Sequence, residues 1–259
     1  MDGYLKKRYA VITDIHGNIE ALNAILKDIK DKNVDDIFCL GDIIGIGPNS
    51  KECINKLMNS NVKSVLGHQE LYLLKGTDIE PSIVGEEKKH YEWVKESLTE
   101  KEINYIKKLP LFYEITIYYD GKVENQKLIL CHYLIADEKR EQPFEKNDLK
   151  KDINLWIKYN DENIMYIIGH LHKSFDPNEV EGICGDFIEE TGCLTNIEIV
   201  DSAGCSDDEY VSYLLIEIDK EMKFKRIKVK FDRKKFINKI INTDFPDKKN
   251  ILKRFYGVE

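Results

Sequence analysis

The sequence has no apolar run long enough to cross a membrane, no Cys-x-x-Cys pair and no excess of basic residues. A membrane-spanning helix needs about 18 or more apolar residues in succession, so we expect no membrane association. We also expect no signal peptide, because the segment from Met1 to Lys7 is polar. The 39 basic residues are outnumbered by 47 acidic residues, and the net charge of −8 argues against binding of long nucleic acid, which needs a basic face. A small phosphorylated ligand held by metal ions is not excluded.

The cysteines carry no motif typical of a redox or zinc centre. Cys39 lies in an apolar run that reads as a buried strand. We therefore predict reduced thiols that act as small buried hydrophobes in a cytoplasmic protein. A hairpin pairing of Cys184 with Cys193 is not predicted. The six cysteines are Cys39, Cys53, Cys131, Cys184, Cys193 and Cys205.

Nothing in the chain marks a domain boundary. We see no internal repeat, low-complexity tract or clear linker in the 259 residues. Hydrophobic residues make up 42% of the chain, which is enough for a large core without disulfides, and charged residues make up 33%. We predict one domain over residues 1–259.

The first 70 residues alternate between strand and helix patterns. Apolar, β-branched runs indicate three buried strands, and apolar residues at helical spacing lie between them. Strand–helix–strand units of this length imply a parallel sheet with right-handed crossovers. The expected strands are 9–13, 36–42 and 61–67, and the expected helices are 18–32 and 50–60.

The rest of the chain mixes helices and strands. Thr99 followed by Glu102 is a capping-box pattern for the start of a helix. The alternating segments 210–218 and 223–231 predict a hairpin. We expect this half to supply a further, largely antiparallel sheet that packs on the first. The other expected helices are 86–97, 99–108, 148–159, 232–242 and 248–256, and the other strands are 112–119, 127–132, 163–172 and 194–200.

Five of the predicted strands end in acidic residues or histidines. Taken singly, these residues have ordinary structural explanations: Asp14 could cap the following helix, and Asp42 could stabilise its own turn. Such an explanation would have to be repeated at all five strand ends. These positions also contain five of the six histidines, all but His90, so structural roles alone do not explain the pattern. The clusters are Asp14 and His16, Asp42, His68 and Glu70, His132, and His170 and His172.

Mixed carboxylate and imidazole ligands suit Mn, Fe, Zn, Co or Ni better than Ca or Mg alone. These clusters exceed the roughly three protein ligands of one catalytic metal. We therefore expect two divalent transition-metal ions that share one carboxylate. Such a pair generates hydroxide at neutral pH and neutralises charge on a phosphoryl group, so the expected reaction is hydrolysis of a phosphate ester.

The order of these motifs resembles that of the calcineurin-like metallophosphoesterases. The resemblance rests on Asp14-x-His16, Gly41-Asp42, Gly67-His68-Gln69-Glu70, His132 and Gly169-His170-Leu171-His172. The segment Gly45-x-Gly47-Pro48 is similar to the small bacterial and archaeal phosphodiesterases of that superfamily. The resemblance runs from about residue 8 to at least residue 175, and 210–231 resembles the closing hairpin of the family.

The resemblance implies an α/β (α+β) fold, a four-layer sandwich of two mixed β-sheets flanked by helices. It also implies the ligands. One ion would be held by Asp14, His16, Asp42 and His172. The other would be held by Asp42, His68, His132 and His170, with Asp42 as the bridge.

The third motif departs from the family pattern, which is Gly-Asn-His followed by Asp or Glu. His68 stands where the family has a metal-binding Asn, and Gln69 stands where it has a His that assists the leaving group. In one arrangement His68 replaces the Asn as ligand, and Gln69 donates a hydrogen bond but no proton. In the other, His68 takes the acid role and Gln69 offers the oxygen ligand. General acid help is often worth about 10²–10⁴-fold in rate.

The resemblance favours a metal-dependent phosphohydrolase that cleaves a small phosphodiester or nucleotide by attack of a metal-bridging hydroxide, with manganese among the candidate metals. One alternative is a phosphomonoesterase or protein phosphatase. Another is a catalytically weakened, metal-bound sensor or binding protein, which Gln69 keeps open. Gln69 is also a candidate to bind substrate, and Tyr133 and Lys173 are candidates by adjacency only.

Overall fold

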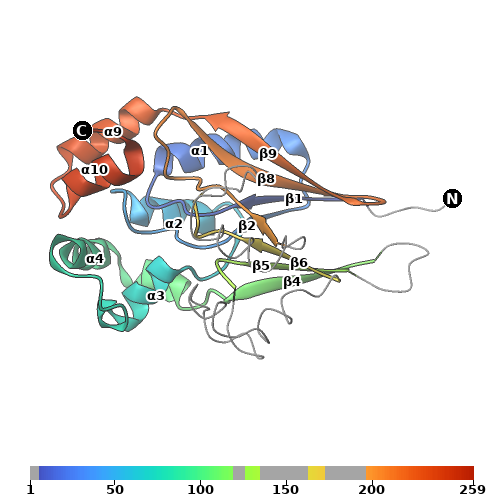
Figure 1. The fold of residues 1–259 in the computed structure, drawn as a ribbon, viewed down its shortest axis with the longest axis horizontal. Helices are drawn as coiled ribbons and strands as arrows, with labels where there is room; N and C mark the ends of the chain where they lie inside the picture. Colours follow the sequence, from blue (N-terminus) through green and yellow to red (C-terminus); the bar gives the residue numbers. More distant parts are fainter. Residues whose placement is uncertain (1–5, 119–125, 135–162, 173–196) are drawn as a thin grey trace, which may run out of the picture.

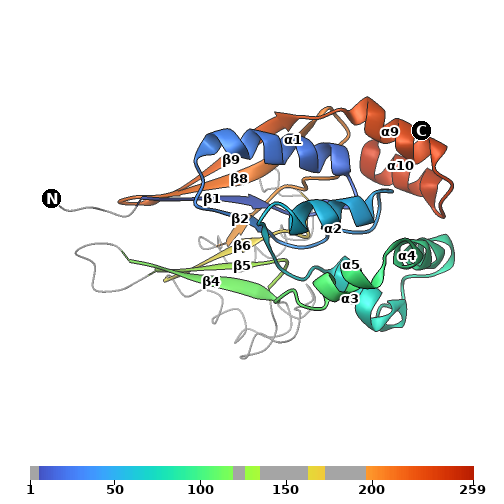
Figure 2. The same cartoon turned by 180° about the vertical axis from the view of Figure 1, so that it is seen from behind.

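The computed structural model describes residues 6–118, 126–134, 163–172 and 197–259. Within them, two β-sheets pack face to face, and most of the helices gather toward one end of the strands (Figures 1 and 2). The strands are β1 (Lys7–Ile12), β2 (Asp36–Cys39), β3 (Lys63–Ser64), β4 (Phe112–Ile117), β5 (Gln126–Cys131), β6 (Ile164–Ile168), β7 (Ile197–Ile199), β8 (Tyr210–Ile218) and β9 (Met222–Lys230). The α-helices are α1 (Ile19–Ile29), α2 (Ser50–Met58), α3 (His68–Lys75), α4 (Gly85–Ser97), α5 (Glu100–Ile106), α9 (Arg233–Asn242) and α10 (Lys248–Tyr256).

The first sheet has the strand order β3-β2-β1-β8-β9. β1 pairs in parallel with β2, and β2 pairs in parallel with β3, as the alternation of strands and helices predicts. β8 runs antiparallel to β1 and joins β9 in a hairpin, so this sheet is mixed. The second sheet has the order β4-β5-β6-β7 and is also mixed, because β4 alone is antiparallel to its neighbour.

One expectation about the second half is wrong. The hairpin of β8 and β9 does not build a separate sheet but extends the first, and the second sheet is mainly parallel rather than antiparallel. The alternation of apolar residues shows which face of a strand is buried, but it does not identify the neighbouring strand. β8 is buried over nearly its whole length, as a strand at the centre of a covered sheet must be.

The buried side chains form layers that follow the alternation of the strands. In β1, Ala10 and Ile12 face the core that α1, α2 and α9 complete on the outer side of the first sheet. Tyr9 and Val11 point the other way and pack between the sheets against residues of β5 such as Leu130. A third cluster lies on β5, β6 and β7 and includes Ile129, Tyr166 and Ile199. The prediction of two mixed sheets flanked by helices is confirmed.

Helix boundaries follow local side-chain chemistry. The Asn18 side chain accepts a hydrogen bond from the Ala21 N–H and starts α1. The predicted capping box of Thr99 and Glu102 starts α5. The sequence did not predict α3, which begins at His68 within the third motif. The helix expected over 148–159 lies outside the described residues, and the single domain over residues 1–259 stays a prediction. No helix among the described residues is both long and apolar enough to cross a membrane.

Candidate metal centre

The polar residues that follow five strands meet at one place between the two sheets. β1, β2 and β3 of the first sheet lead into Asp14, Asp42 and His68. β5 and β6 of the second sheet lead into His132 and His170. The sheets are joined there by a hydrogen bond from the His170 N–H to Asp14 Oδ2, at 2.9 Å. The expected convergence at the carboxyl ends of the strands is therefore present in the structure.

The backbone at this place is held in an uncommon conformation. Five residues of the cluster have positive φ values, a region that Asp and His enter more readily than most other residues but still rarely. Such strain costs on the order of 1–3 kcal/mol per residue and concentrates at functional sites. The values are 52° for Asp14, 47° for His16, 50° for Asp42, 67° for His170 and 64° for His172.

A glycine lets the second sheet approach the first at this point. A Cβ atom on Gly169 would lie 2.0 Å from Thr13 Oγ1 and 2.8 Å from Asp14 Oδ2. No real side chain fits that space, so only glycine permits the turn after β6 to come this near to Asp14. The close approach places His170 and His172 beside ligand candidates from the other sheet.

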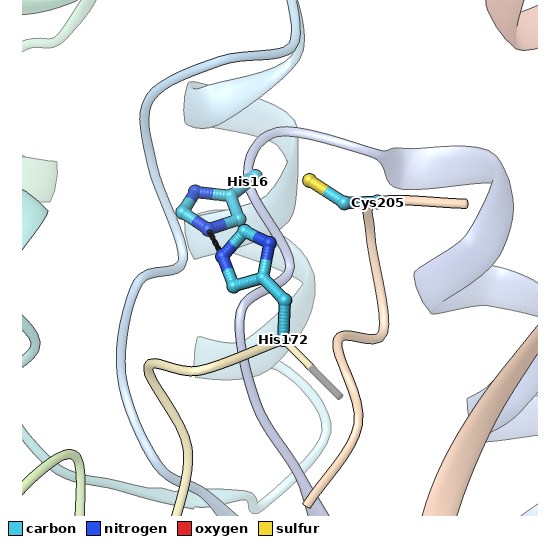
Figure 3. Close-up of side chains that lie close together, drawn as sticks. All are labelled: His16, His172 and Cys205. Carbon is cyan, nitrogen blue, oxygen red and sulfur yellow. Dashed lines mark hydrogen bonds between the residues drawn. The ribbon is translucent and has the colours of Figure 1, made fainter. Parts of the chain in front are cut away.

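Three side chains form the first half of the centre. The Nε2 atoms of His16 and His172 lie 3.0 Å apart, and Figure 3 shows the two rings facing one another. Asp14 Oδ1 lies 3.5 Å from the Nε2 atom of His16 and 3.4 Å from that of His172. Asp14 and His16 are almost completely buried. The three atoms surround a space where a cation would meet one oxygen and two nitrogens.

The second half is built around Asp42. Its Oδ2 atom lies 2.9 Å from His68 Nδ1, and its Oδ1 atom lies 3.3 Å from His132 Nε2. His68 Nδ1 is also 3.0 Å from His132 Nε2 and 3.2 Å from His170 Nδ1. Three imidazoles and a carboxylate from four segments of the chain thus share one small volume.

Asp42 also faces the first half, because its Oδ2 atom is 3.8 Å from His16 Nε2. Asp14 Oδ1 and Asp42 Oδ2 are both buried and have no hydrogen-bond partner among the described residues. A buried carboxylate oxygen without a partner is costly unless a cation lies against it. These two oxygens, each aimed at a group of imidazoles, are the observation that best fits a pair of metal ions.

Backbone carbonyls on the side away from the cluster determine which nitrogen of His16 and His132 is free to bind a metal. His16 Nδ1 lies 3.2 Å from the carbonyl of Ile44, and His132 Nδ1 lies 2.9 Å from the carbonyl of Leu40. A carbonyl can only accept, so each Nδ1 carries the proton and donates it. The Nε2 lone pairs then point into the cluster, which is how histidine ligands are normally oriented by their surroundings.

The buried carboxylates need positive charge beside them, and the pKa values of the buried groups are shifted accordingly. Burial by itself would raise the pKa of the Asp42 carboxyl, but His132 and His68 hold that pKa well below its usual range. His16 and His172 act in the same way on the pKa of Asp14. Despite its burial, His132 has its pKa raised to about 9, chiefly by Asp42. Two metal ions would supply the same positive charge in place of protons.

The side chains of the third motif point in different directions. His68 faces Asp42, whereas the Gln69 side chain lies 2.9 Å from the outer nitrogen of His68, Nε2. The Gln69 carboxamide lies against Gly45, where a Cβ atom would be 2.3 Å from Gln69 Oε1. The first of the two arrangements left open by the sequence requires this geometry. That His68 binds a metal stays a prediction.

Glu70 has a role that the sequence did not indicate. Its buried carboxylate accepts hydrogen bonds from the backbone N–H groups of Asp42, Ile43, Ile44 and Gly67, at 2.8 to 3.1 Å. It therefore holds the loop after β2 to the start of α3. Burial, with the Asp42 charge as a second cause, raises the pKa of Glu70 to about 7.

Cys205 is a further residue that the sequence analysis did not place at the centre. Its Sγ atom lies within 4.8 Å of the ligand nitrogens of both His16 and His172, and Figure 3 shows the thiol beside the His172 ring. The thiol is free, as are those of Cys39 and Cys53. No sequence pattern around Cys205 predicts that it lies at the centre. The pair Cys184 and Cys193 lies outside the described residues.

The remaining candidates are placed only in part. The Tyr133 ring is 5.1 Å from that of His132 and 5.5 Å from that of His170, so it borders the second half of the centre. Lys173 lies outside the described residues. His90, the histidine set apart by the sequence, is buried away from the cluster and stacks on Trp93.

Comparison with known proteins agrees with this arrangement. A family model described as calcineurin-like phosphoesterase matches residues 7–195. The chain belongs to the calcineurin-like phosphoesterase family. An uncharacterized protein of Methanocaldococcus jannaschii is 29% identical over 262 residues, which cover 94% of this chain and 96% of that protein.

Two further comparisons cover different shares of this phosphoesterase. A symmetrical bis(5'-nucleosyl)-tetraphosphatase of Psychromonas ingrahamii is 36% identical over 67 residues, 25% of this chain and 24% of that protein. The crystal structure of a metallophosphoesterase from Sphaerobacter thermophilus superposes with a TM-score of 0.63 at 19% identity, over 96% of this chain and 98% of that one. At that identity the superposition shows the shared fold, and it confirms the predicted sandwich.

Proposed function

We propose that this phosphoesterase uses two divalent transition-metal ions to hydrolyse a small phosphodiester or nucleotide. Asp14, His16, Asp42 and His172 would hold one ion, and Asp42, His68, His132 and His170 would hold the other. The observation that carries this proposal is Asp42, whose buried Oδ2 atom has no hydrogen-bond partner among the described residues and faces imidazoles of both halves. Manganese is one candidate metal, and the free thiols of Cys39, Cys53 and Cys205 support a reducing compartment such as the cytoplasm.

When bound, two such ions supply a hydroxide at neutral pH and neutralise charge on the phosphoryl oxygens. The protein residues hold that chemistry in position. Asp42 ties the two halves together, and the carbonyls of Ile44 and Leu40 orient His16 and His132. Glu70 fixes the loop that carries Asp42. Burial of both carboxylates keeps water from weakening their attraction for cations.

The third motif limits the choice of substrate. Gln69 cannot deliver a proton to a departing oxygen, and the outer nitrogen of His68 is occupied by Gln69 at 2.9 Å. Loss of general acid help matters least when the leaving group is stable as an anion. We therefore expect an ester or anhydride whose leaving group is a weak base.

The direct test is hydrolysis of bis(p-nitrophenyl) phosphate beside p-nitrophenyl phosphate, with Mn²⁺ and with a chelator. We expect diester turnover that exceeds monoester turnover and disappears with the chelator. A higher rate on the monoester would favour the phosphomonoesterase alternative. No turnover of either compound, in protein shown to hold two metals, would refute hydrolysis as its function.

Gln69 favours a second candidate, a metal-bound protein that senses or binds its ligand with little catalysis. The double variant His68→Asn with Gln69→His restores the family motif and separates the two candidates. A large gain in rate would show that the natural site is weakened and support the binding role. A loss in rate would show that the natural residues are adapted to their own reaction.

A further inference from the structure

A cavity of about 780 Å³ opens between α4 and α10, beside the metal centre. Figure 1 shows these two helices one above the other at the same end of the molecule. Ile46 and Gln69 line the cavity on the side of the metal centre, and the two helices supply most of the remaining lining. Its volume lies in the range of small-molecule sites, about 300–1,000 Å³, and far exceeds the space that one phosphate needs.

The cavity adjoins both halves of the metal centre through single residues. Gln69, which lines the cavity, is 2.9 Å from the outer nitrogen of His68. The ring of Phe255, which lines it from α10, is centred 6.1 Å from the ring of His172. The metal centre and the cavity are therefore neighbours, near enough for one small substrate to reach both.

The charge of the lining changes along α10. Lys253 and Arg254 lie in the last turn, next to Phe255, and neither has an ion-pair partner among the described residues. Asp247 lies at the other end of the helix, roughly 12 Å away at 1.5 Å per residue. Glu86 of α4 also lines the cavity. The cationic end of the cavity is thus the end nearest the metals.

Ring faces and unpaired polar groups complete the lining. The Arg254 guanidinium lies over the Phe255 ring, 5.2 Å from its centre, and is held at the cavity by that contact. Tyr91 lies on the opposite helix. His90 also lines the cavity, is 5% exposed, and has no hydrogen-bond partner for either ring nitrogen among the described residues. A ligand with its own donors and acceptors would supply those missing contacts.

We propose that this cavity binds the nucleoside part of a nucleotidyl substrate whose phosphate lies at the metal centre. The proposal rests on the proposed function and names its substrate class. Lys253 would lie nearest the phosphate, Arg254, Phe255 and Tyr91 would contact the nucleoside, and Glu86 would accept from its donor groups. A free phosphate would use only the cationic end, and a lipid chain would leave the ring nitrogens of His90 without a partner.

Binding can be measured without turnover. Trp93 stacks on His90 at 5.9 Å between ring centres, so its fluorescence reports on the wall of the cavity. The probe is adenosine 5'-monophosphate, titrated into the full chain carrying Trp156→Phe, with a chelator present and inorganic phosphate as comparison. We expect the nucleotide, but not phosphate, to change the signal, and Arg254→Ala to weaken nucleotide binding at least about tenfold, the loss of one charge-assisted contact.

Lys249→Ala is the matched control, because Lys249 is an exposed cation of the same helix that does not line the cavity. It should bind the nucleotide as the unaltered protein does. Equal binding by the Arg254→Ala and Lys249→Ala proteins would overturn the proposal. So would a nucleotide signal no larger than that of phosphate.

Turnover of two esters tests the cavity assignment separately from the proposed hydrolase function. The substrates are the p-nitrophenyl ester of thymidine 5'-monophosphate and bis(p-nitrophenyl) phosphate, which has no nucleoside. We expect Arg254→Ala to lower kcat/KM for the nucleoside ester about tenfold and to change that for the second ester less than about twofold. Equal losses on both esters would overturn the cavity assignment while leaving the hydrolase intact. No turnover of either ester by the unaltered protein would refute the proposed function, and the binding titration would still decide the cavity assignment.

Discussion

Asp42 Oδ2 lies 2.9 Å from His68 Nδ1 and 3.8 Å from His16 Nε2, so one oxygen faces both halves of the centre. Asp42→Asn keeps the shape of the side chain but removes its charge from both metal positions. We expect hydrolysis of the chromogenic diester to fall at least about 100-fold, since charge stabilisation by the metals is worth several kcal/mol.

The matched control for this change is Asp78→Asn. Asp78 is an exposed carboxylate that pairs with Lys88 on the surface. It should retain full activity, because exposed ion pairs contribute little. Near-normal turnover by the Asp42→Asn protein would contradict a bridging role for Asp42.

The number of bound metals tests the two arrangements of the third motif. We expect His68→Ala to bind about one metal ion fewer per chain, measured by elemental analysis after dialysis against metal. His90→Phe is the control, because His90 is the one histidine outside the cluster among the described residues. Unchanged metal content in the His68→Ala protein would instead favour Gln69 as the ligand.

The convergence of the ligand candidates could be predicted from the sequence because it follows from chain direction. Parallel strands bring their carboxyl ends to one edge, so Asp14 and Asp42 had to be neighbours once β1 and β2 were recognised. The His132 and His170 positions follow in the same way from β5 and β6. The positive φ values at these residues could not be predicted, because Asp and His keep them only where the surrounding structure holds the chain in that conformation.

The positions of β8 and α10 were beyond the reach of local patterns. The apolar residues of β8 predict a strand but not its neighbours, and only its pairing with β1 places it in the first sheet. The sequence showed α10 as a charged terminal helix. Its contribution of Arg254 and Phe255 to the cavity depends on its return to α4, more than 150 residues earlier in the chain. Contacts of that range leave no local signal.

Cys205 should affect metal binding through His172. Its Sγ atom lies within 4.8 Å of the ligand nitrogen of His172 and is placed to orient that ring, whose Nε2 atom faces Asp14. Groups that orient a ligand in this way typically change metal affinity by about 10–100-fold. We expect Cys205→Ala to weaken metal binding by a factor in that range, measured by competition with a chromogenic chelator, and Cys205→Ser to recover part of it.

Cys53→Ala removes a buried thiol from α2, away from the centre, and is the control for general effects of losing a cysteine. It should bind metal with unchanged affinity. An equal loss in the Cys53→Ala and Cys205→Ala proteins would show that Cys205 acts through stability rather than through His172.

The stability of the metal-free protein should depend on pH through His90. Burial lowers the pKa of His90 to about 4, although the Asp247 carboxylate and the Pro246 carbonyl oppose the shift. The unfolded chain takes up the proton near pH 6.5, so it binds more protons than the folded chain between these two values. Stability is therefore fully present above about pH 6.5 and falls as the pH drops toward 4, by up to about 3 kcal/mol.

His90→Phe removes this titration while keeping a ring between Trp93 and Phe245. Urea unfolding of both proteins between pH 7 and pH 4, with a chelator present, measures the difference in their free energies of unfolding. We expect the variant to gain stability relative to the unaltered protein as the pH falls through this window. The other titrating groups are common to both proteins and cancel in the difference. A difference that stays constant from pH 7 to pH 4 would show that His90 is not held neutral by its burial.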